Sequence, residues 1–299
     1  SKDKTYSYIP ALDPATFTPD ADYFHICLNN TIYGTTWNTL PDTGSVPLVA
    51  DASSCILSKP YDVSKFALIY AGAQKNMGIA GLTVVILRED LVGHAREGTP
   101  TMLDYATHVK NDSKFNTPPT YAIYILKLML DWITQEIGGL EAMERRNREK
   151  AAVLYDFLDQ SKLFTGTVAK ADRSLMNIPF VTPSAELDAK FLAQAKAAGL
   201  VNLKGHRSVG GCRASIYNAM PKAGVEKLVE LMDVISEAHG GIPLAQIAIN
   251  WATQKDFVAS SIVGVQHRER IMENCNSFDW ELTPEESAIL DAAIRLYLE

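Results

Sequence analysis

Short apolar runs separated by polar turns dominate the first 90 positions of the chain. Four of these runs stand out in sequence order: "YFHICL", "VPLVAD", "FALIYAG" and "LTVVILR". Three of them show no alternation of apolar and polar residues, which is typical of strands buried on both faces of a largely parallel sheet. We therefore expect a parallel-rich sheet, preceded by an irregular lead-in over residues 1–22.

Helical periodicity follows the segment "NTPPT". The pattern "YAIYILKLMLDWITQEI" predicts a helix with a proline near its first turn, and the glycines at 138–139 end it. A second helix is predicted over about 140–160. Its charged run "ERRNREK" is most simply its solvated side.

The pattern changes near residue 163. Short strands ("FTGTVAK", "MNIPFV") alternate with helices ("AELDAKFLAQAKAAG", "GVEKLVELMDVISEAHG"), and a strand-turn-strand piece, "LVNLKGHRSVGGCRASIYNA", lies between them. The last part reads as a helix, a strand and a final helix that opens with a capping box at Thr283. The fold class is therefore α/β, with parts over 1–135, 136–233 and 234–299.

Composition narrows the function classes. A net charge of −7 and a pI near 5.4 argue against general nucleic-acid binding. The four cysteines are isolated, which excludes the common zinc patterns and fits a reduced compartment. No apolar run approaches membrane-spanning length and no signal peptide is visible, so we expect a cytoplasmic protein without a metal site.

A lysine and an aspartate follow two neighbouring predicted strands. Asp51 ends "VPLVAD", and Lys75 follows "FALIYAG". Groups just past the carboxyl ends of neighbouring strands converge on the ligand crevice of an α/β sheet. Such a lysine can form a Schiff base with pyridoxal phosphate while the carboxylate keeps the pyridine nitrogen protonated. The alternative is a salt bridge at the strand ends.

The segment "GHRSVGGCR" gathers a histidine and two arginines around a glycine turn. It provides the local basic cluster that an acidic protein needs for an anionic substrate, and the arginine fork suits carboxylate and phosphate. The alternative is an exposed hairpin with incidental charges.

Several motifs in one order resemble a known family. "HICLNNTIYGT", "LVADASS", "DVSKFALIYAGAQKNMGIAGLTVVILREDL", "NTPPTYAIY" and "GHRSVGGCRASIYNAMP" together resemble the phosphoserine aminotransferases, which are pyridoxal-phosphate enzymes of fold type I. The resemblance covers about residues 1–233. It implies a cytoplasmic homodimer that interconverts phosphoserine and 2-oxoglutarate with 3-phosphohydroxypyruvate and glutamate, in serine biosynthesis.

The resemblance implies roles at the cofactor. Lys75 would be the Schiff-base lysine, and Gln74 would touch the cofactor phosphate. Asp51 would pair with the pyridinium nitrogen, Ser53 would lie near the phosphate, and Thr31 would approach the phenolic oxygen. Without the family, Thr31 and Ser53 are most simply strand-end caps.

Other roles concern a partner subunit and the substrate. Asn116 and Thr117 would reach across a dimer interface to the phosphate of the partner's cofactor. His206, Arg207 and Arg213 would bind the phosphate and carboxylate of the substrate. Read alone, Asn116 and Thr117 could equally form the N-cap of the helix that follows.

The resemblance breaks at both ends. The family's first strands, a small-residue turn that cradles the cofactor phosphate and an aromatic that stacks on the ring have no match here, which predicts an incompletely walled site. From residue 234, "GIPLAQIAINWATQ" and "RERIMEN" resemble the last unit of the NADPH-dependent aldo-keto reductases. Arg270 and Asn274 fit that pattern, whereas Gly264 and Val265 replace its usual lysine and serine.

Three functions follow from these observations. The first is the aminotransferase. The second is a catalytically inactive composite of two enzyme pieces, natural or engineered. The third, an NADPH-dependent oxidoreductase, rests on the tail alone, and one barrel unit cannot close a barrel.

Overall fold

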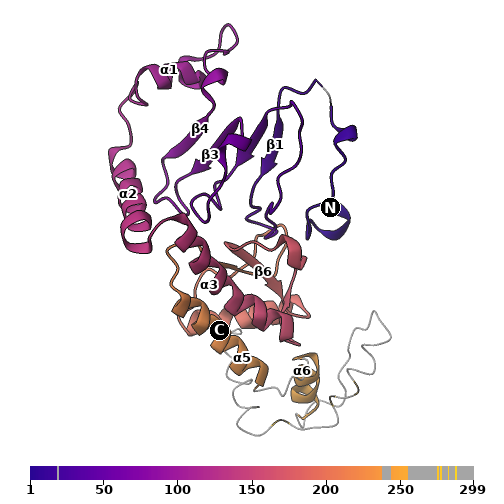
Figure 1. The fold of residues 1–299 in the computed structure, drawn as a ribbon. Helices are drawn as coiled ribbons and strands as arrows, with labels where there is room; N and C mark the ends of the chain where they lie inside the picture. The colour runs from indigo at the N-terminus through magenta and orange to yellow at the C-terminus, as the bar shows by residue number, and fades with distance from the viewer. Residues whose placement is uncertain are drawn as a thin grey trace.

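The computed structural model describes residues 1–18, 20–237 and 244–254, together with residues 275, 277, 282 and 287. Two sheets organise this part of the chain, and Figure 1 shows the first above the second, with a long helix beside the second. The predictions made from the sequence for Gly264, Val265, Arg270, Asn274 and the capping box at Thr283 lie outside the described residues.

The first sheet has four strands in the order β1-β2-β3-β4. They are β1 (Phe24–Cys27), β2 (Leu48–Asp51), β3 (Leu68–Gly72) and β4 (Thr83–Leu87). The first three are parallel and β4 runs antiparallel to β3. Cys27 pairs in register with Asp51, and Asp51 with Tyr70, so three side chains line up at one edge of the sheet.

Only one face of this sheet is buried, so the prediction of strands buried on both faces was wrong. Exposure alternates along β2 and β3: Ala50, Ile69 and Ala71 are buried, whereas Asp51 and Tyr70 are partly exposed. The apolar runs hid this alternation because apolar residues such as Val49, Leu68 and Tyr70 also occupy the second face. That second face carries Cys27, Asp51 and Tyr70 near the carboxyl ends of the parallel strands.

Helices follow the first sheet. They are α1 (Tyr105–Lys110), α2 (Thr120–Asp131), a π-helical turn (Trp132–Ile137) and α3 (Leu140–Gln160). The predicted bounds of the long helix are confirmed, because Gly138 and Gly139 both adopt positive φ angles that stop the preceding helix. Short 3₁₀ turns occur at Lys2–Lys4, Pro14–Thr16, Val63–Lys65, Glu89–Leu91, Thr101–Leu103 and Lys170–Asp172.

The second sheet is antiparallel, in the order β5-β6-β7. Its strands are β5 (Thr165–Gly166), β6 (Asn177–Val181) and β7 (Cys212–Ser215), and its helices are α4 (Ala185–Ala197) and α5 (Lys222–Glu237), with α6 (Leu244–Thr253) after them. The expected strand "FTGTVAK" shrinks to two residues. The first arm of the strand-turn-strand piece contributes one bridge, between Lys204 and Cys212.

Two apolar clusters form the core. One lies under the first sheet and includes Leu28, Ala50 and Met77. The other packs α3, α4 and α5 on the second sheet, around Phe164 and Phe180. The three-part division of the chain, 1–135, 136–233 and 234–299, stays a prediction.

A buried polar network joins the two sheets. The side-chain amide of Asn29 donates to Ser54 Oγ (2.8 Å) and to Asn177 Oδ1 (2.9 Å), and its oxygen accepts from Ser174 Oγ (2.6 Å). Nearby, Gly34 approaches so closely that a Cβ there would lie 2.3 Å from Pro179 Cδ. Buried networks of this kind fix one arrangement because every unpaired member is costly.

Lys150 of α3 is fully buried and gives a pH-dependent prediction. Its amine donates to the carbonyls of Tyr217 (2.7 Å) and Met220 (3.2 Å), and burial, with Arg146 nearby, lowers its pKa to about 8. Between pH 8 and the usual 10.5 the unfolded chain holds a proton that the folded chain has released, so rising pH favours folding. Relative to a Lys150→Met variant, the native free energy of unfolding should rise by up to about 1.4 kcal/mol per pH unit.

Urea denaturation of both proteins at pH 8, 9 and 10 measures this difference. Subtracting the unfolding free energies of the two proteins removes the contribution of the other titrating groups, which both proteins share. A difference that stays constant over this range would show that Lys150 keeps its proton and contradict the prediction.

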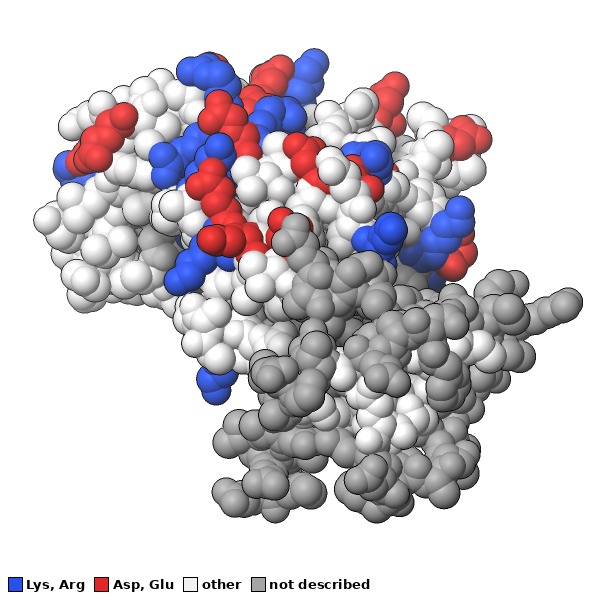
Figure 2. Space-filling view, turned by 90° about the horizontal axis from the view of Figure 1, so that it is seen from below, with Lys and Arg blue, Asp and Glu red and all other residues white. Residues whose placement is uncertain are grey.

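Two surface properties bear on function. Within the described ranges no helix is long and apolar enough to cross a membrane. Figure 2 shows basic and acidic side chains interspersed on the described part of one face, without the single basic field that a nucleic-acid surface needs.

Candidate functional site

Lys75 lies in the turn that follows β3 and is half-buried. Its Nζ donates to Thr31 Oγ1 at 2.8 Å. Burial lowers the pKa of Lys75, while the negative charge of Asp51 partly opposes that shift. A lysine with a lowered pKa has a larger neutral fraction near pH 7, and the neutral amine is the nucleophile.

Asp51 lies at the end of β2. Its Oδ1 accepts the backbone N–H of Ser53 at 2.8 Å. Among the ion pairs of the described residues none joins Asp51 to Lys75. The salt-bridge alternative is therefore wrong for this structure, and both groups keep free capacity for a ligand.

Tyr70 and His25 extend the Asp51 site, and the sequence interpretation missed both. Burial first, and then the negative charge of the Asp51 carboxylate, raises the pKa of Tyr70. His25 Nε2 lies 3.1 Å from the Tyr70 hydroxyl. The available signal was positional, because His25 and Tyr70 occupy the same face of the sheet as Asp51 on the two neighbouring strands.

Ser53 and Gln74 lie beside the strand ends. Ser53 Oγ accepts the N–H of Gly72 at 3.1 Å, so it holds the end of β3 to the loop after β2. Gln74 is exposed, and its amide covers Gly72, where an added Cβ would lie 2.5 Å from Gln74 Oε1. Because glycine has no side chain, position 72 leaves room for the Gln74 amide.

Arg213 reaches this cluster from β7 in the second sheet. Its Nη1 donates to the carbonyl of Thr31 at 3.1 Å, and its buried Nε has no partner in the described structure. Its positive charge also contributes to the lowered pKa of Lys75. A half-buried guanidinium with an unused donor is suited to an anionic ligand.

His206 and Arg207 lie on the hairpin turn before β7. His206 Nδ1 is 2.7 Å from Ser208 Oγ, and Arg207 is exposed. Within the described ranges no hydrogen bond or ion pair joins either residue to Lys75 or Asp51. Arg207 is open to solvent, whereas His206 is half-buried in the turn.

Asn116 and Thr117 are exposed in the segment before α2. Among the described residues, no hydrogen bond joins either of them to Lys75. The N-cap of α2 is Pro119, without a side-chain capping bond. The interpretation of Asn116 or Thr117 as an N-cap was therefore wrong, because the two prolines place the helix start further along.

The gathered groups have a defined chemistry. A half-buried amine of lowered pKa, a carboxylate held by a backbone N–H, and the hydroxyl and amide groups of Thr31, Ser53 and Gln74 share one edge of the sheet. These residues fit an aldehyde-bearing, phosphorylated pyridine cofactor, which needs an amine, a carboxylate at the ring nitrogen and polar donors at the phosphate.

Comparison with known proteins agrees with this chemistry. The sequence profile of the family described as aminotransferase class-V matches residues 2–228. The chain belongs to this family, and its fold is that of the fold type I aminotransferases.

Among individual relatives, the chain is similar to phosphoserine aminotransferases. That of Bacillus cereus is 57% identical over 232 residues, which are 78% of this chain and 64% of the relative. The solved structure from Bacillus circulans subsp. alkalophilus matches with a TM-score of 0.77 and 47% identity, over 80% of this chain and 66% of that one. A phosphoserine aminotransferase of Trichomonas vaginalis, described as bound to PLP, matches with a TM-score of 0.72 and 41% identity, over 76% and 64% of the two chains.

The chain thus spans a little under two thirds of the length of these relatives. Residues 229–299 lie outside the family match. The similarity of residues 234–299 to aldo-keto reductases and the composite origin of the chain stay predictions.

Proposed function

We propose that this chain carries the active site of a pyridoxal-phosphate-dependent aminotransferase that interconverts phosphoserine and 2-oxoglutarate with 3-phosphohydroxypyruvate and glutamate. The observation that carries the proposal is Lys75, a half-buried amine of lowered pKa held by Thr31 beside Asp51. Similarity to named phosphoserine aminotransferases supports the substrate.

The cofactor, when bound, supplies a carbonyl that an amine can attack and a ring that stores the electrons of the substrate's α-carbon. Lys75 would hold the cofactor through its amine and, once released, move a proton at the α-carbon. Asp51 would keep the ring nitrogen protonated, with the backbone N–H of Ser53 orienting its carboxylate. Gln74 and Ser53 would bind the phosphate.

The substrate anions would be bound from the second sheet. Arg213 would take one anionic group, since its Nε is unpaired and its Nη1 touches Thr31. The half-buried His206 and the exposed Arg207 would take the other as it enters. Opposite sides of the site would therefore hold the reacting carbon and the distal anion.

Arg213→Gln tests that assignment. The variant keeps a donor to the Thr31 carbonyl but loses the charge, so we expect KM for phosphoserine to rise about 10- to 100-fold with a smaller change in kcat. Steady-state kinetics measure both constants. The matched control is Arg88→Gln, which removes an exposed arginine paired with Asp90, and it should change neither constant. Equal losses in both variants would contradict the role of Arg213.

A second copy of the chain is the proposed partner. Helix α2 exposes several large apolar side chains, among them Tyr121 (68% exposed) and Tyr124 (54%), directly after Asn116 and Thr117. An apolar face of this kind marks an association surface, and it would carry Asn116 and Thr117 to the partner's cofactor.

Sedimentation measures that association. We expect the native chain to sediment as a dimer and a Tyr121→Lys, Tyr124→Lys variant to shift toward monomer, because two charges would be buried at the interface. A matched Tyr23→Lys variant changes an exposed tyrosine (59%) ahead of β1 and should remain dimeric. Identical sedimentation of all three proteins would place any dimer interface elsewhere.

Reconstitution tests the function itself. The purified protein is mixed with pyridoxal phosphate, its visible spectrum is recorded, and borohydride reduction is followed by peptide mass mapping. A visible absorption band with the label on Lys75, together with turnover of phosphoserine and 2-oxoglutarate, supports the proposal. Absence of the band, or label spread over surface lysines, favours the catalytically inactive alternative.

A further inference from the structure

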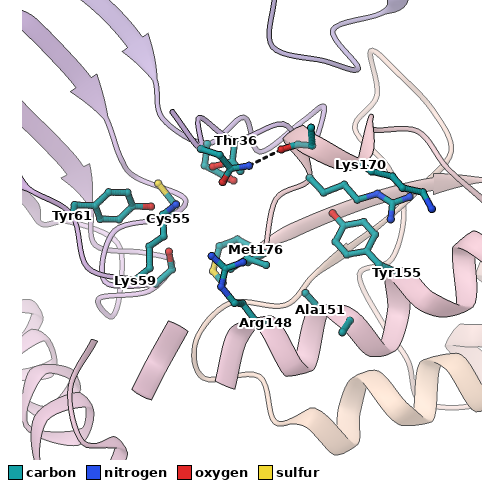
Figure 3. Close-up of a pocket in the computed structure, with 16 residues that line it drawn as sticks. Thr36, Cys55, Lys59, Tyr61, Arg148, Ala151, Tyr155, Lys170 and Met176 are labelled. Atoms are coloured by element: carbon teal, nitrogen blue, oxygen red, sulfur yellow. Dashed lines mark hydrogen bonds between the residues drawn. The ribbon is translucent and has the colours of Figure 1, made fainter. Parts of the chain in front are cut away.

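A second pocket, of about 550 Å³, lies between the two sheets and away from Lys75. Its walls come from four places: the segment from Asn29 to Asn38, the segment from Cys55 to Tyr61, the middle of α3, and the segment from Lys170 to Met176. Figure 3 shows Lys59 and Tyr61 on one side, Tyr155 and Lys170 on the other, and Arg148 between them. Cys55, which lines the pocket, lies four residues after Asp51, so the loop that follows β2 connects the candidate active site to this pocket along the chain.

The described lining residues contain four cationic side chains and no carboxylate. The cations are Lys59, Arg148, Lys170 and Arg173. Two carboxylates just outside the lining neutralise part of this charge: Glu144 pairs with Arg148, and Asp159 pairs with both Arg173 and Lys170. An excess of two positive charges remains in a chain whose net charge is −7.

Arg173 is held rigidly. Its two Nη atoms are committed to Asp159, and its guanidinium lies 4.5 Å from the centre of the Tyr155 ring. Its Nε is buried and has no partner in the described structure. The pairing with Arg173 and Lys170 holds the pKa of Asp159 well below its usual range, so this arrangement persists at neutral pH.

The unused donors point to one kind of anion. Arg148 spends Nε and one Nη on Glu144, which leaves its other Nη. Lys59 contacts only the face of Tyr61, at 5.4 Å, among the ion-pair and cation–π contacts of the described residues. What remains is a set of single donors on different walls. A carboxylate offers two acceptor oxygens in one plane, whereas a tetrahedral phosphate offers three that can accept single donors from several directions.

We propose that this pocket binds the phosphate group of a small phosphorylated molecule. Lys59 and Arg148 provide charge from two of the walls, and Arg173 adds a fixed positive charge with an unpaired Nε. The rings of Tyr61 and Tyr155, with Leu175 and Met176, leave an apolar wall for the carbon part of the ligand. This site is independent of the function proposed for Lys75.

Inorganic phosphate is the probe. Protein labelled with ¹⁵N-arginine is titrated with phosphate at constant ionic strength, and the Nε–H resonance of Arg173 is followed, because it reports on this pocket alone. We expect a saturable shift that sodium chloride does not reproduce. Lys59→Gln and Arg148→Gln should each weaken the apparent affinity about tenfold or more, since each removes a charged donor. Arg88→Gln, at an exposed pair elsewhere, should leave it unchanged.

Two further arms separate the alternatives. Succinate should bind at least about tenfold more weakly than phosphate; equal binding would overturn the phosphate assignment. The Lys75→Ala variant should show the native phosphate shift even if it has lost the cofactor, so failure of the proposed function leaves this result unaffected. A shift that chloride reproduces, or one that survives both Lys59→Gln and Arg148→Gln, would overturn the pocket as a binding site.

Discussion

Replacing Lys75 with alanine is expected to abolish transamination and leave the fold intact. The amine is half-buried, and its only hydrogen bond among the described contacts goes to Thr31, so the fold does not depend on it. Loss of the group that both holds the cofactor and moves the proton should lower kcat by about 10³-fold or more. Phosphoserine turnover, the visible spectrum and circular dichroism are the measurements.

Lys65→Ala is the matched control, because Lys65 is an exposed lysine just before β3. It should retain full activity and the visible band. Burial also lowers the pKa of Lys75, so the rate of its modification by an amine reagent should rise with pH around a midpoint below 10.5. Measurable turnover in Lys75→Ala would end the assignment.

Replacing Asn29 with alanine is expected to cost about 3 kcal/mol of unfolding free energy. This side chain is 2% exposed and its three hydrogen bonds connect the two sheets. Its removal leaves Ser54, Ser174 and Asn177 without a shared partner in the interior, and unpaired buried groups cost about 1–3 kcal/mol each before relaxation.

Urea denaturation at pH 7 measures the effect. Asn116→Ala is a suitable control, because Asn116 is exposed and makes only a 3.4 Å contact with its neighbour's carbonyl; its change should stay within about 0.5 kcal/mol. A loss below about 1 kcal/mol in Asn29→Ala would mean that water or neighbouring groups replace the network.

Much of the fold followed from local pattern. The bounds of α3 were predictable because two glycines and a clear apolar stripe mark a helix independently of its surroundings. The four strands of the first sheet were located for a similar reason. Their one-sided burial was not, because alternation in "FALIYAG" separates a tyrosine from an isoleucine, and both count as apolar in a binary pattern.

The candidate site divides in the same way. Asp51 and Lys75 could be brought to one edge from the rule that parallel strands end together. The contact of Arg213 with Thr31 could not, because it joins two sheets across 182 positions, and no short-range pattern encodes that distance. His25 and Tyr70 were missed because their meeting depends on strand order and register.

Thr31 belongs to both halves of the molecule at once. Its hydroxyl holds the amine of Lys75, and its carbonyl holds the guanidinium of Arg213. An incoming anion that draws Arg213 toward itself must pull on, or release, the same residue that restrains the amine. Under the proposed function, charge arriving at the second sheet would therefore act on the Lys75 amine through Thr31, whose hydroxyl and carbonyl make the two contacts.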